Sequence, residues 1–396
     1  MDTPQYSHLH AALSAVPDPR HRRGCRYPWP VLLTLLAAAV VSGQQGVRAI
    51  AQWVAEHAEE LAPLVALPPG RVPSAATLRR TLQTVDVVAL EERIAAFVAA
   101  LPTPPAAGPP TTAPIPSPGP TPAAWEGLAL DGKAVRGANR HGAHVYLLGL
   151  VRHGDGRVLG QVAVAAKDNE ITAAPRLLAR RDLSGTVTTT DALLTQRELA
   201  DQIRAQGGHY LMVVKANQPA LLAAIDRLFT TPPPPAVTDE AAQITTCDKG
   251  HGRLELRTLE RSAALNAYLD WPDVGQVLRR TCQRVELITG VIGEETTYGV
   301  TSLPTTTSAA ELEALWRGHW TIENKVHRVR DATFGEDASQ LRAGRAPQAL
   351  AALRNGVLGL LRALGWTNIA DALRHYAASA PRAIALLATP PTQLCL

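Results

Sequence analysis

Gly185-Thr-Val-Thr-Thr-Thr-Asp191 is a run of β-branched residues that ends in a single acid. Threonine and valine favour strands, because branched side chains pack well on a pleated surface. Residues 170–181 before this run and residues 195–206 after it have the apolar spacing of helices. A strand between two helices is typical of a helix-covered sheet, so Asp191 is predicted at the carboxyl end of a sheet strand.

Further elements alternate on both sides of this strand. We expect strands at 127–135, 145–151, 157–166 and 209–215 and a helix at 218–229, with His153-Gly-Asp-Gly156 as a hairpin turn. The order of three strands, helix, strand, helix, strand and helix is that of a ribonuclease-H-like domain. The predicted fold class is therefore mixed α/β.

A proline-rich segment divides the chain. Ten of the 31 prolines lie between Pro102 and Pro122, which predicts an extended tether and not a helix or sheet. The region before it is predicted to be a small all-helical domain, since 29–42, 47–57 and 90–100 have helical patterns. The predicted parts are a helical N-terminal domain at 1–100, a linker at 101–124, the α/β domain at 125–370 with a β-rich insertion at about 237–303, and a C-terminal tail at 371–396.

The composition is that of a folded protein that can meet polyanions. The 396 residues are 46% hydrophobic and 19% charged, and the net charge is +4. Aromatic residues make up only 4%, which argues against a single-strand binder that works by base stacking. The first residues are not expected to form a signal peptide, and the longest apolar run, Val31 to Val41, is shorter than the about 20 residues that a membrane span needs. We expect a cytoplasmic protein with no membrane segment.

Arginines are concentrated in two places of the N-terminal region. The candidates for contacts with DNA phosphates are Arg20, Arg22, Arg23, Arg26, Arg79 and Arg80. Pro73-Ser74 resembles a helix start with Ser74 as the N-cap, which would put Arg79 and Arg80 on a helix. A plain solvated surface is the alternative for each cluster.

Three acids stand out by position. Asp131 lies in an apolar strand, where a carboxylate is costly unless something pairs with it. Asp191 ends another strand, and in the predicted order the two strands can be neighbours, so their carboxylates could share a cation. Glu323 belongs to a predicted helix from Ser308 to Arg330.

That helix has two stripes with helical spacing. The apolar stripe is Leu312, Leu315, Ile322, Val326 and Val329, and the second stripe is Trp316, His319, Glu323, His327 and Arg330. Docking by the apolar stripe would turn the edge that carries Glu323 toward both aspartates. Three carboxylates suit Mg²⁺ or Mn²⁺, which prefer oxygen ligands. Single acids are more often surface or cap residues, and a zinc stripe of His319, Glu323 and His327 lacks the usual spacing.

Several stretches resemble one insertion-sequence family, the H-repeat-associated DDE transposases. They are LDGKAVRG (130–137), GQVAVAAKDNEITAAPR (160–176), TTDALLTQRELA (189–200), VVKANQP (213–219), DKGHGRLE (248–255) and RGHWTIENKVHRVRDATFGEDASQLRAG (317–344). The family's N-terminal associated domain is similar to residues 9–55, including VPDPRHRRG (16–24). The resemblance spans nearly the whole chain apart from the tether.

The resemblance implies a ribonuclease-H-like core with a β-rich insertion. It places the DDE acids on Asp131, Asp191 and Glu323 as metal ligands, and a basic residue seven positions later on Arg330. Two positions depart from the family, which usually has His where this chain has Leu194 and Trp where it has Arg328. These departures concern the handling of substrate near the site.

The resulting prediction is a bacterial insertion-sequence transposase. It would cleave and join DNA with Mg²⁺ or Mn²⁺, act on duplex DNA at the element ends and at the target, and work as a homodimer or higher assembly at the nucleoid. Arg330 is expected to hold a phosphate, and further phosphate contacts are expected from Lys133, His319 and His327. The alternatives are a DNA-binding relative that has lost catalysis and a metal-dependent nuclease without strand transfer.

Overall fold

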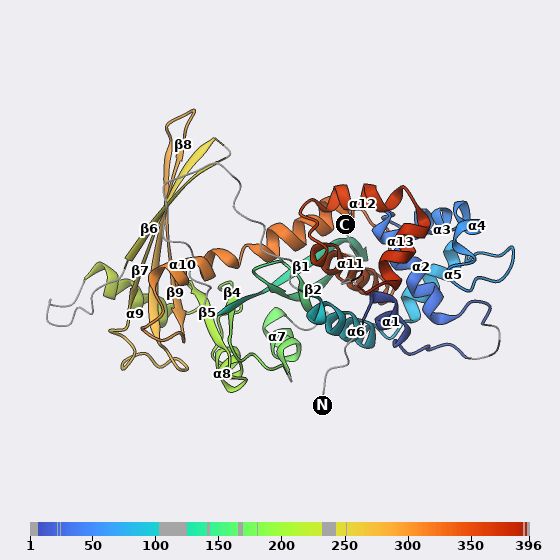
Figure 1. Cartoon of the computed structure of the whole chain (residues 1–396). Coiled ribbons are helices and arrows are strands. Elements are labelled where there is room, and N and C mark those ends of the chain that lie inside the picture. Colours follow the sequence, from blue (N-terminus) through green and yellow to red (C-terminus); the bar gives the residue numbers. More distant parts are fainter. Residues whose placement is uncertain are drawn as a thin grey trace. The chain divides into compact units, whose positions relative to one another are not determined.

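The protein is described by a computed structural model in which the chain forms two compact units (Figure 1). The described residues are 7–21, 23, 25–102, 125–140, 143–164, 169–179, 181–231, 243–250, 252–390 and 393. The helical unit consists of 1–115, 132–169 and 322–396, and the sheet unit consists of 116–131 and 170–321. The boundary between the units therefore falls within the first strand, after Asp131, and again between Thr321 and Ile322.

The sheet unit contains the parallel part of the sheet and an antiparallel extension of it. Its strands, in spatial order, are β1 (Glu126–Arg140, of which 126–131 belong to this unit), β4 (Thr186–Thr190), β5 (His209–Val214), β9 (Ile292–Thr301), β8 (Gln276–Glu286), β7 (Arg253–Ser262) and β6 (Gln243–Gly250). β1, β4 and β5 pair in parallel, and every later pair is antiparallel. The run of threonine and valine at 186–190 is buried apart from its first residue, as expected for a central strand.

The described residues of this unit contain four helices. They are α7 (Glu170–Leu178), α8 (Arg197–Ala205), α9 (Pro219–Thr230) and α10 (Ala309–Gly318). α10 begins at Ser308 with a reciprocal capping box to Glu311. Its apolar face, including Leu312 and Leu315, packs in one core cluster with strand residues such as Val187 of β4. This packing fixes the direction in which the chain leaves the sheet.

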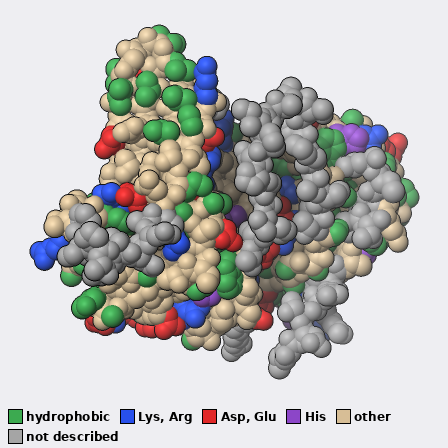
Figure 2. Space-filling view, turned by 60° about the vertical axis from the view of Figure 1, so that its left-hand side comes forward, with side chains coloured by type: hydrophobic (Ala, Val, Ile, Leu, Met, Phe, Trp, Pro, Cys, Tyr) green, Lys and Arg blue, Asp and Glu red, His purple; other side chains and the backbone are tan. Residues whose placement is uncertain are grey.

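The outer strands β6 to β9 form an arm (Figures 1 and 2). Hydrophobic side chains are exposed at the β8–β9 turn, where Leu287, Ile288, Val291 and Ile292 are 48%, 93%, 59% and 70% exposed. This arm corresponds to the segment at about 237–303 that the sequence predicts to be rich in strands. Residues 232–242 lie outside the described residues.

The helical unit combines elements from both ends of the chain. Its helices are α1 (Leu9–Ser14), α2 (Trp29–Val41), α3 (Val47–Glu56), α4 (Ala58–Leu61), α5 (Ala75–Thr84), α6 (Val87–Ala100), α11 (Ala346–Ala363), α12 (Ile369–Ala377) and α13 (Ala380–Ala388). Strands β2 (Ala143–Arg152) and β3 (Val158–Val164) pair antiparallel, and α6 and α11 pack on β3. α2 is buried at almost every position because α1, α3, α11 and α13 pack around it. No described helix is long and apolar enough to cross a membrane.

The structure divides the chain differently from the predicted domains. Residues 1–100 do not form a compact unit of their own, because α11 packs on α2, α5 and α6. Residues 371–396 are not merely a tail, since α12 and α13 bury Leu373, Ile384 and Leu387. These apolar faces need a partner, and the N-terminal helices provide it. The predicted tether lies outside the described residues, which resume at 125.

The predicted helix from Ser308 to Arg330 is also changed. α10 ends at Gly318, and the chain continues in two π-helical segments, η2 (Ile322–His327) and η3 (Val329–Thr333). A π-helix places hydrogen bonds between residues five apart, so stripes with α-helical spacing do not continue through it. The apolar stripe remains buried as far as Val326, whereas the second stripe mixes an exposed Glu323 with a buried Arg330.

Candidate active site

Two predicted acids lie next to each other in the register of the sheet unit. Leu130 of β1 is paired with Thr190 of β4 in a parallel ladder. Asp131 and Asp191 are the next residues of these two strands, so both follow the last pair at the carboxyl edge. Both side chains are half-buried. This confirms the prediction that the two strands are neighbours, and it brings two oxygen donors to one edge of the sheet.

Asp191 is held by the turn that follows it. Its Oδ1 accepts a hydrogen bond from the backbone N–H of Leu194 at 3.1 Å. The hydroxyl of Thr195 donates to the carbonyl of Asp191 at 3.1 Å and to that of Val213. The side chain of Leu194 is fully buried, so this position supports Asp191 through its backbone. The departure from the family at this position therefore leaves the turn in place.

His319 lies behind the same strand ends. Its Nδ1 is 3.0 Å from the hydroxyl of Thr189, which donates to the carbonyl of Leu128 at 3.1 Å. Since a hydroxyl has one hydrogen to donate, Nδ1 carries the hydrogen in the contact with Thr189, and Nε2 is left as the acceptor nitrogen. Burial lowers the pKa of His319, and the negative charge of Asp191 opposes this effect. His319 therefore supports Thr189 of β4, whose hydroxyl in turn bonds to β1.

Glu170 is a neighbour of this site that the sequence analysis does not single out. It is the first residue of α7, and its pKa is raised by burial and by the negative charge of Asp191. A signal was present in the sequence, since Glu170 lies within one of the stretches that resemble the transposase family. In isolation, however, an acid in the first turn of a helix is explained by the helix dipole.

The third predicted acid, Glu323, belongs to the helical unit. It is exposed in η2, between the buried residues Ile322 and Val326. His327, in the same segment, is half-buried, and Arg328 is exposed. Short π-helical segments inside longer helices are frequent at functional sites, because they re-aim side chains at the expense of regular hydrogen bonding.

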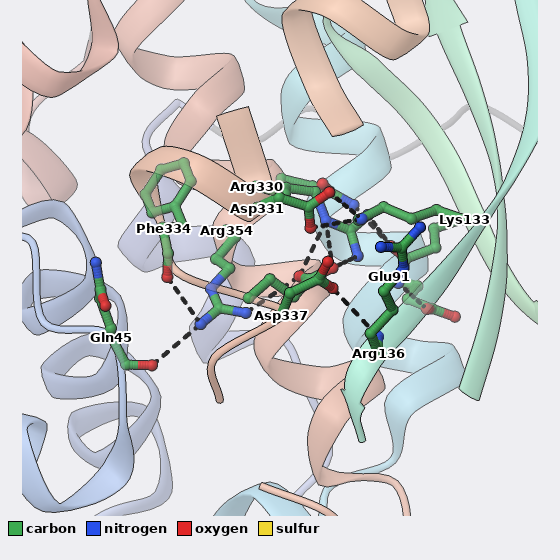
Figure 3. A network of polar contacts seen from close by, with 12 residues as sticks. Gln45, Glu91, Lys133, Arg136, Arg330, Asp331, Phe334, Asp337 and Arg354 are labelled. Atoms are coloured by element: carbon green, nitrogen blue, oxygen red, sulfur yellow. Dashed lines mark hydrogen bonds and ion pairs between the residues drawn. The ribbon is translucent and has the colours of Figure 1, made fainter. Parts of the chain in front are cut away.

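A buried ionic network stabilises the segment after Glu323 (Figure 3). Glu336, which is 1% exposed, accepts hydrogen bonds from Arg330 at 2.7–3.1 Å and from Arg354 at 3.1 Å. Burial alone would raise the pKa of Glu336, but the two guanidinium groups hold it below its ordinary value. Arg330 also donates to Gln161 of β3, and Arg354 donates to the backbone carbonyls of Gln45 and Phe334.

Asp331 and Asp337, on either side of Glu336, also have partners in the structure. Asp331 forms an ion pair of 2.5 Å with Lys133, and Asp337 accepts the backbone N–H of Arg136. Lys133 is 7% exposed, so the predicted phosphate contact would require it to exchange this partner. Arg330 is likewise 3% exposed and bonded, which favours a positioning role over a direct contact with phosphate.

The loop that carries these acids presses on β1 at Gly137. A Cβ atom at this position would lie 2.4 Å from the carbonyl oxygen of Ser339 and 2.8 Å from those of Glu336 and Asp337. Such approaches are shorter than any ordinary contact, so glycine is required here. The requirement explains a glycine of the LDGKAVRG stretch in terms of packing.

The predicted DNA-contacting arginines of the helical unit differ in their surroundings. Arg20 pairs with Asp18 at 2.8 Å, donates to the carbonyl of Tyr27 and lies over the ring of Trp29. It is therefore held in a local structure. The others within the described residues are exposed, namely Arg23, Arg26, Arg79 and Arg80. Ser74 caps α5 as predicted, and Arg22 lies outside the described residues.

The donor set fits a hard divalent cation in part. Asp131 and Asp191 provide carboxylate oxygens at one edge of the sheet unit, the ligands that Mg²⁺ and Mn²⁺ prefer. In the parts of the chain that the structure describes, no group of three or more His, Cys, Asp or Glu side chains is close enough to hold a metal. Two carboxylates of the proposed three are therefore placed together, and Glu323 belongs to the other unit.

Comparison with known proteins identifies relatives along most of the chain. Residues 111–360 match the family described as "Transposase DDE domain", and residues 10–98 match the family described as "DDE_Tnp_1-associated". The chain is 32% identical over 244 residues to the "Putative transposase YncI" of Escherichia coli O157:H7, which covers 59% of this chain and 61% of the relative. It is 30% identical over 243 residues to the "H repeat-associated putative transposase YhhI" of Escherichia coli K12, covering 59% and 63%. The matches thus span about three fifths of the length of these relatives.

Proposed function

The chain belongs to the Transposase DDE domain family, and from this premise we propose that it is the DNA transposase of a bacterial insertion sequence. It would cleave DNA at the element ends and join the freed 3′ ends to target DNA. The observation that carries the proposal is the pair Asp131 and Asp191, which directly follow Leu130 and Thr190, the last pair of the parallel ladder between β1 and β4. The relatives named as transposases support the same assignment.

The sheet topology supports a ribonuclease-H-like core for this reaction. β2 and β3 are antiparallel, β1, β4 and β5 are parallel, and the chain order of strands and helices is the one that the sequence predicts. In this proposal the β6–β9 arm is the insertion between the second aspartate and Glu323. Open sheets of this kind hold their ligands at the carboxyl end of the parallel strands, and both aspartates directly follow the last parallel pair of β1 and β4.

Asp131, Asp191 and Glu323 are proposed to hold Mg²⁺ or Mn²⁺. The bound cations would activate the attacking oxygen and stabilise the leaving oxygen of a phosphodiester. The turn at Leu194 fixes Asp191, and the hydrogen bond from the Thr189 hydroxyl to the Leu128 carbonyl ties together the strands that carry the two aspartates. Arg330 acts as a positioning residue through Glu336. The reaction needs few other catalytic groups, because phosphoryl transfer depends mainly on the positioning of the reactants and on the neutralisation of charge.

Duplex DNA is the proposed partner, and the exposed arginines of the helical unit are its proposed contacts. Arg79 and Arg80 lie on α5, and Arg23 and Arg26 precede α2. Arginine neutralises backbone phosphates without reading the sequence, so these contacts would position the protein on DNA. Assembly of two or more chains on paired element ends is part of the proposal.

The test is strand cleavage of a plasmid that carries the gene with its native flanking DNA. The wild-type protein should cleave at the element ends with Mg²⁺ or Mn²⁺ and not with EDTA. The variants Asp131→Ala, Asp191→Ala and Glu323→Ala should each lose cleavage and still bind DNA, and double variants should lose no more, because one deletion already disables a shared site.

Asp201→Ala is the matched control, since Asp201 is an exposed acid on α8. Full cleavage by the Glu323→Ala protein, or activity that survives EDTA, would contradict the proposal. Binding to DNA without any cleavage by the wild-type protein would favour the non-catalytic relative. Cleavage without strand joining would favour the nuclease.

A further inference from the structure

The two faces of the β6–β9 arm carry different kinds of side chain. Residues that are directly opposite in an antiparallel ladder point to the same face, so the register assigns each residue of the arm to one face. One face is ionic. Arg257 forms ion pairs with Asp248 and Glu255, and Arg284 lies 3.4 Å from Glu295. This face pairs opposite charges within the arm.

The other face is apolar at its outer end. Leu254 of β7, Val285 of β8 and Ile292 of β9 are directly opposite one another and form a row across three strands. Leu256 points to the same face and is 37% exposed, Ile292 is 70% exposed, and Ile288 in the turn beyond it is 93% exposed. Figure 2 shows hydrophobic side chains gathered on the arm. We call these five residues the arm patch. Single exposed aliphatic residues are ordinary, whereas a contiguous group of them marks an interaction surface.

The contacts of α9 with this face lie farther inward. Arg279 of β8 donates to the carbonyl of Phe229 at 2.9 Å and lies over its ring, and the Tyr298 hydroxyl donates to Asp226. Arg279 and Tyr298 are directly opposite each other, six residues along the strands from the row of Val285. Six residues of a strand span about 20 Å, so the arm patch lies well beyond these contacts.

The charges that border the arm patch have opposite signs on its two sides. Lys249 of β6 is directly opposite Leu254 and therefore continues the apolar row on one side. Glu294 of β9 points to the same face as Ile292 and borders the row on the other side. Both side chains are exposed, and Glu294 accepts a hydrogen bond from the neutral amide of Gln283 at 2.8 Å. The face thus has a positive side at β6 and a negative side at β9.

We propose that the arm patch is the surface through which two copies of this chain associate face to face. A two-fold axis parallel to the strands exchanges the two sides of the sheet, so β6 of each copy lies over β9 of the other. Lys249 of one protomer then lies beside Glu294 of its partner, and the same pair forms a second time. An axis across the strands would bring like charges together. The charge pattern therefore fits a second copy of this chain.

DNA fits the arm patch less well than a second copy does. Residues 284–295 contain one arginine and three glutamates, namely Glu286, Glu294 and Glu295. An apolar side chain such as Ile288 can wedge between base pairs, but the protein must then hold the adjacent phosphates with basic groups. The acids beside the patch would repel those phosphates, whereas each of the two Glu294 side chains meets a lysine in the proposed dimer.

Sedimentation equilibrium of the full chain, without DNA or metal, tests the proposal. The wild-type protein should approach twice the mass of one chain as its concentration rises. Ile292→Asp and Ile288→Asp should each weaken the association on the order of 100-fold, because the two-fold axis removes each apolar side chain twice. Tyr268→Asp is the matched control, since Tyr268 is 82% exposed and lies between β7 and β8, at the end of these strands opposite to the patch.

Exchange of the two charges tests the orientation of the copies. Lys249→Glu and Glu294→Lys should each weaken the association about 5-fold, because each variant places like charges together twice. The double variant, which exchanges the two charges, should associate as wild type does. Losses that add in the double variant would overturn the proposed two-fold arrangement.

The other outcomes overturn the arm patch as the interface. They are a wild-type protein that stays monomeric and an association that survives both aspartate variants, as pairing through the β6 edge would. A monomer whose DNA affinity falls in Ile288→Asp would assign the patch to DNA. The inference does not rest on the proposed function, because Asp191→Ala should associate as wild type does. Loss of cleavage in that variant, and association through the arm patch, can therefore each fail alone.

Discussion

Glu91 connects three elements of the helical unit and should make its stability depend on pH. Its carboxylate, on α6, accepts hydrogen bonds from Gln161 of β3 at 2.7 Å and from Gln348 of α11 at 3.0 Å. Burial raises the pKa of Glu91 from 4.5 to about 7, although these hydrogen bonds and the charge of Arg330 oppose the rise. The folded state therefore favours the protonated form.

Because the pKa of Glu91 is raised in the folded state, the protein should lose stability as the pH rises. Between pH 4.5 and 7 the folded state binds more protons at Glu91 than the unfolded state, so stability falls as the pH rises through this range. A gap of about 2.5 pH units at about 1.4 kcal/mol each corresponds to about 3 kcal/mol of stability, present at pH 4.5 and lost by pH 8. The substitution Glu91→Gln keeps an oxygen that can accept from both glutamines and removes the titrating proton.

Urea unfolding of wild type and Glu91→Gln across pH 4.5–8 measures this difference. The two proteins should be about equally stable at pH 4.5, and the variant should be more stable by about 3 kcal/mol at pH 8. Other titrating groups are common to both proteins and cancel in the comparison. Glu92→Gln is the control, because Glu92 is its exposed neighbour on α6. A difference that does not change with pH, or a variant less stable than wild type at pH 8, would refute the account of Glu91.

Two further predictions concern the packing of a loop and the binding of DNA. Gly137→Ala should displace the loop at 336–339, because its Cβ would collide with three carbonyl oxygens. Proteolysis at that loop should therefore become faster. The control is Gly154→Ala, which has open space around its Cβ and should behave as wild type. Replacing Arg79 and Arg80 of α5 by glutamine should weaken DNA binding for all sequences alike and reduce the salt slope by up to about 1.8, as measured by fluorescence anisotropy, and an unchanged slope would place the DNA elsewhere.

The sequence is sufficient to predict the central strands and the neighbouring positions of Asp131 and Asp191. Runs of β-branched residues such as Thr186 to Thr190 strongly favour the strand conformation. Two strands that pair in parallel run in the same direction, so the residues that follow their last pair lie on the same side of the ladder. The register of Asp131 and Asp191 follows from these two facts. The helix starts at Ser74 and Ser308 are also predictable, because each serine caps the first turn of its helix with its own side chain.

The π-helical segments, the burial of Glu336 and the packing of the C-terminal helices could not be predicted, because they depend on contacts between distant segments. Nothing in the local pattern indicates that α10 gives way to π-helical segments, which are braced by Arg362 and by the ion pair of Arg330 with Glu336. Glu336 lies in a run of acids that resembles a solvated surface, and only its two arginine partners make its burial tolerable. The C-terminal helices belong to the helical unit because their apolar faces pack on the N-terminal helices, and a local sequence pattern does not show which faces will pack together.

The central claim is that three acids from distant parts of the chain hold the same metal ions, and iron-mediated cleavage of the protein tests it most directly. Fe²⁺ can replace Mg²⁺ at oxygen-rich sites, and with ascorbate and peroxide it cuts the polypeptide close to where it is bound. With element-end DNA present, the wild-type protein should be cut near Asp131, Asp191 and Glu323, and excess Mg²⁺ should suppress all three cuts. In Asp191→Ala the three cuts should disappear together. Cuts near the two aspartates without one near Glu323, or cuts that persist in the variant, would contradict a shared site.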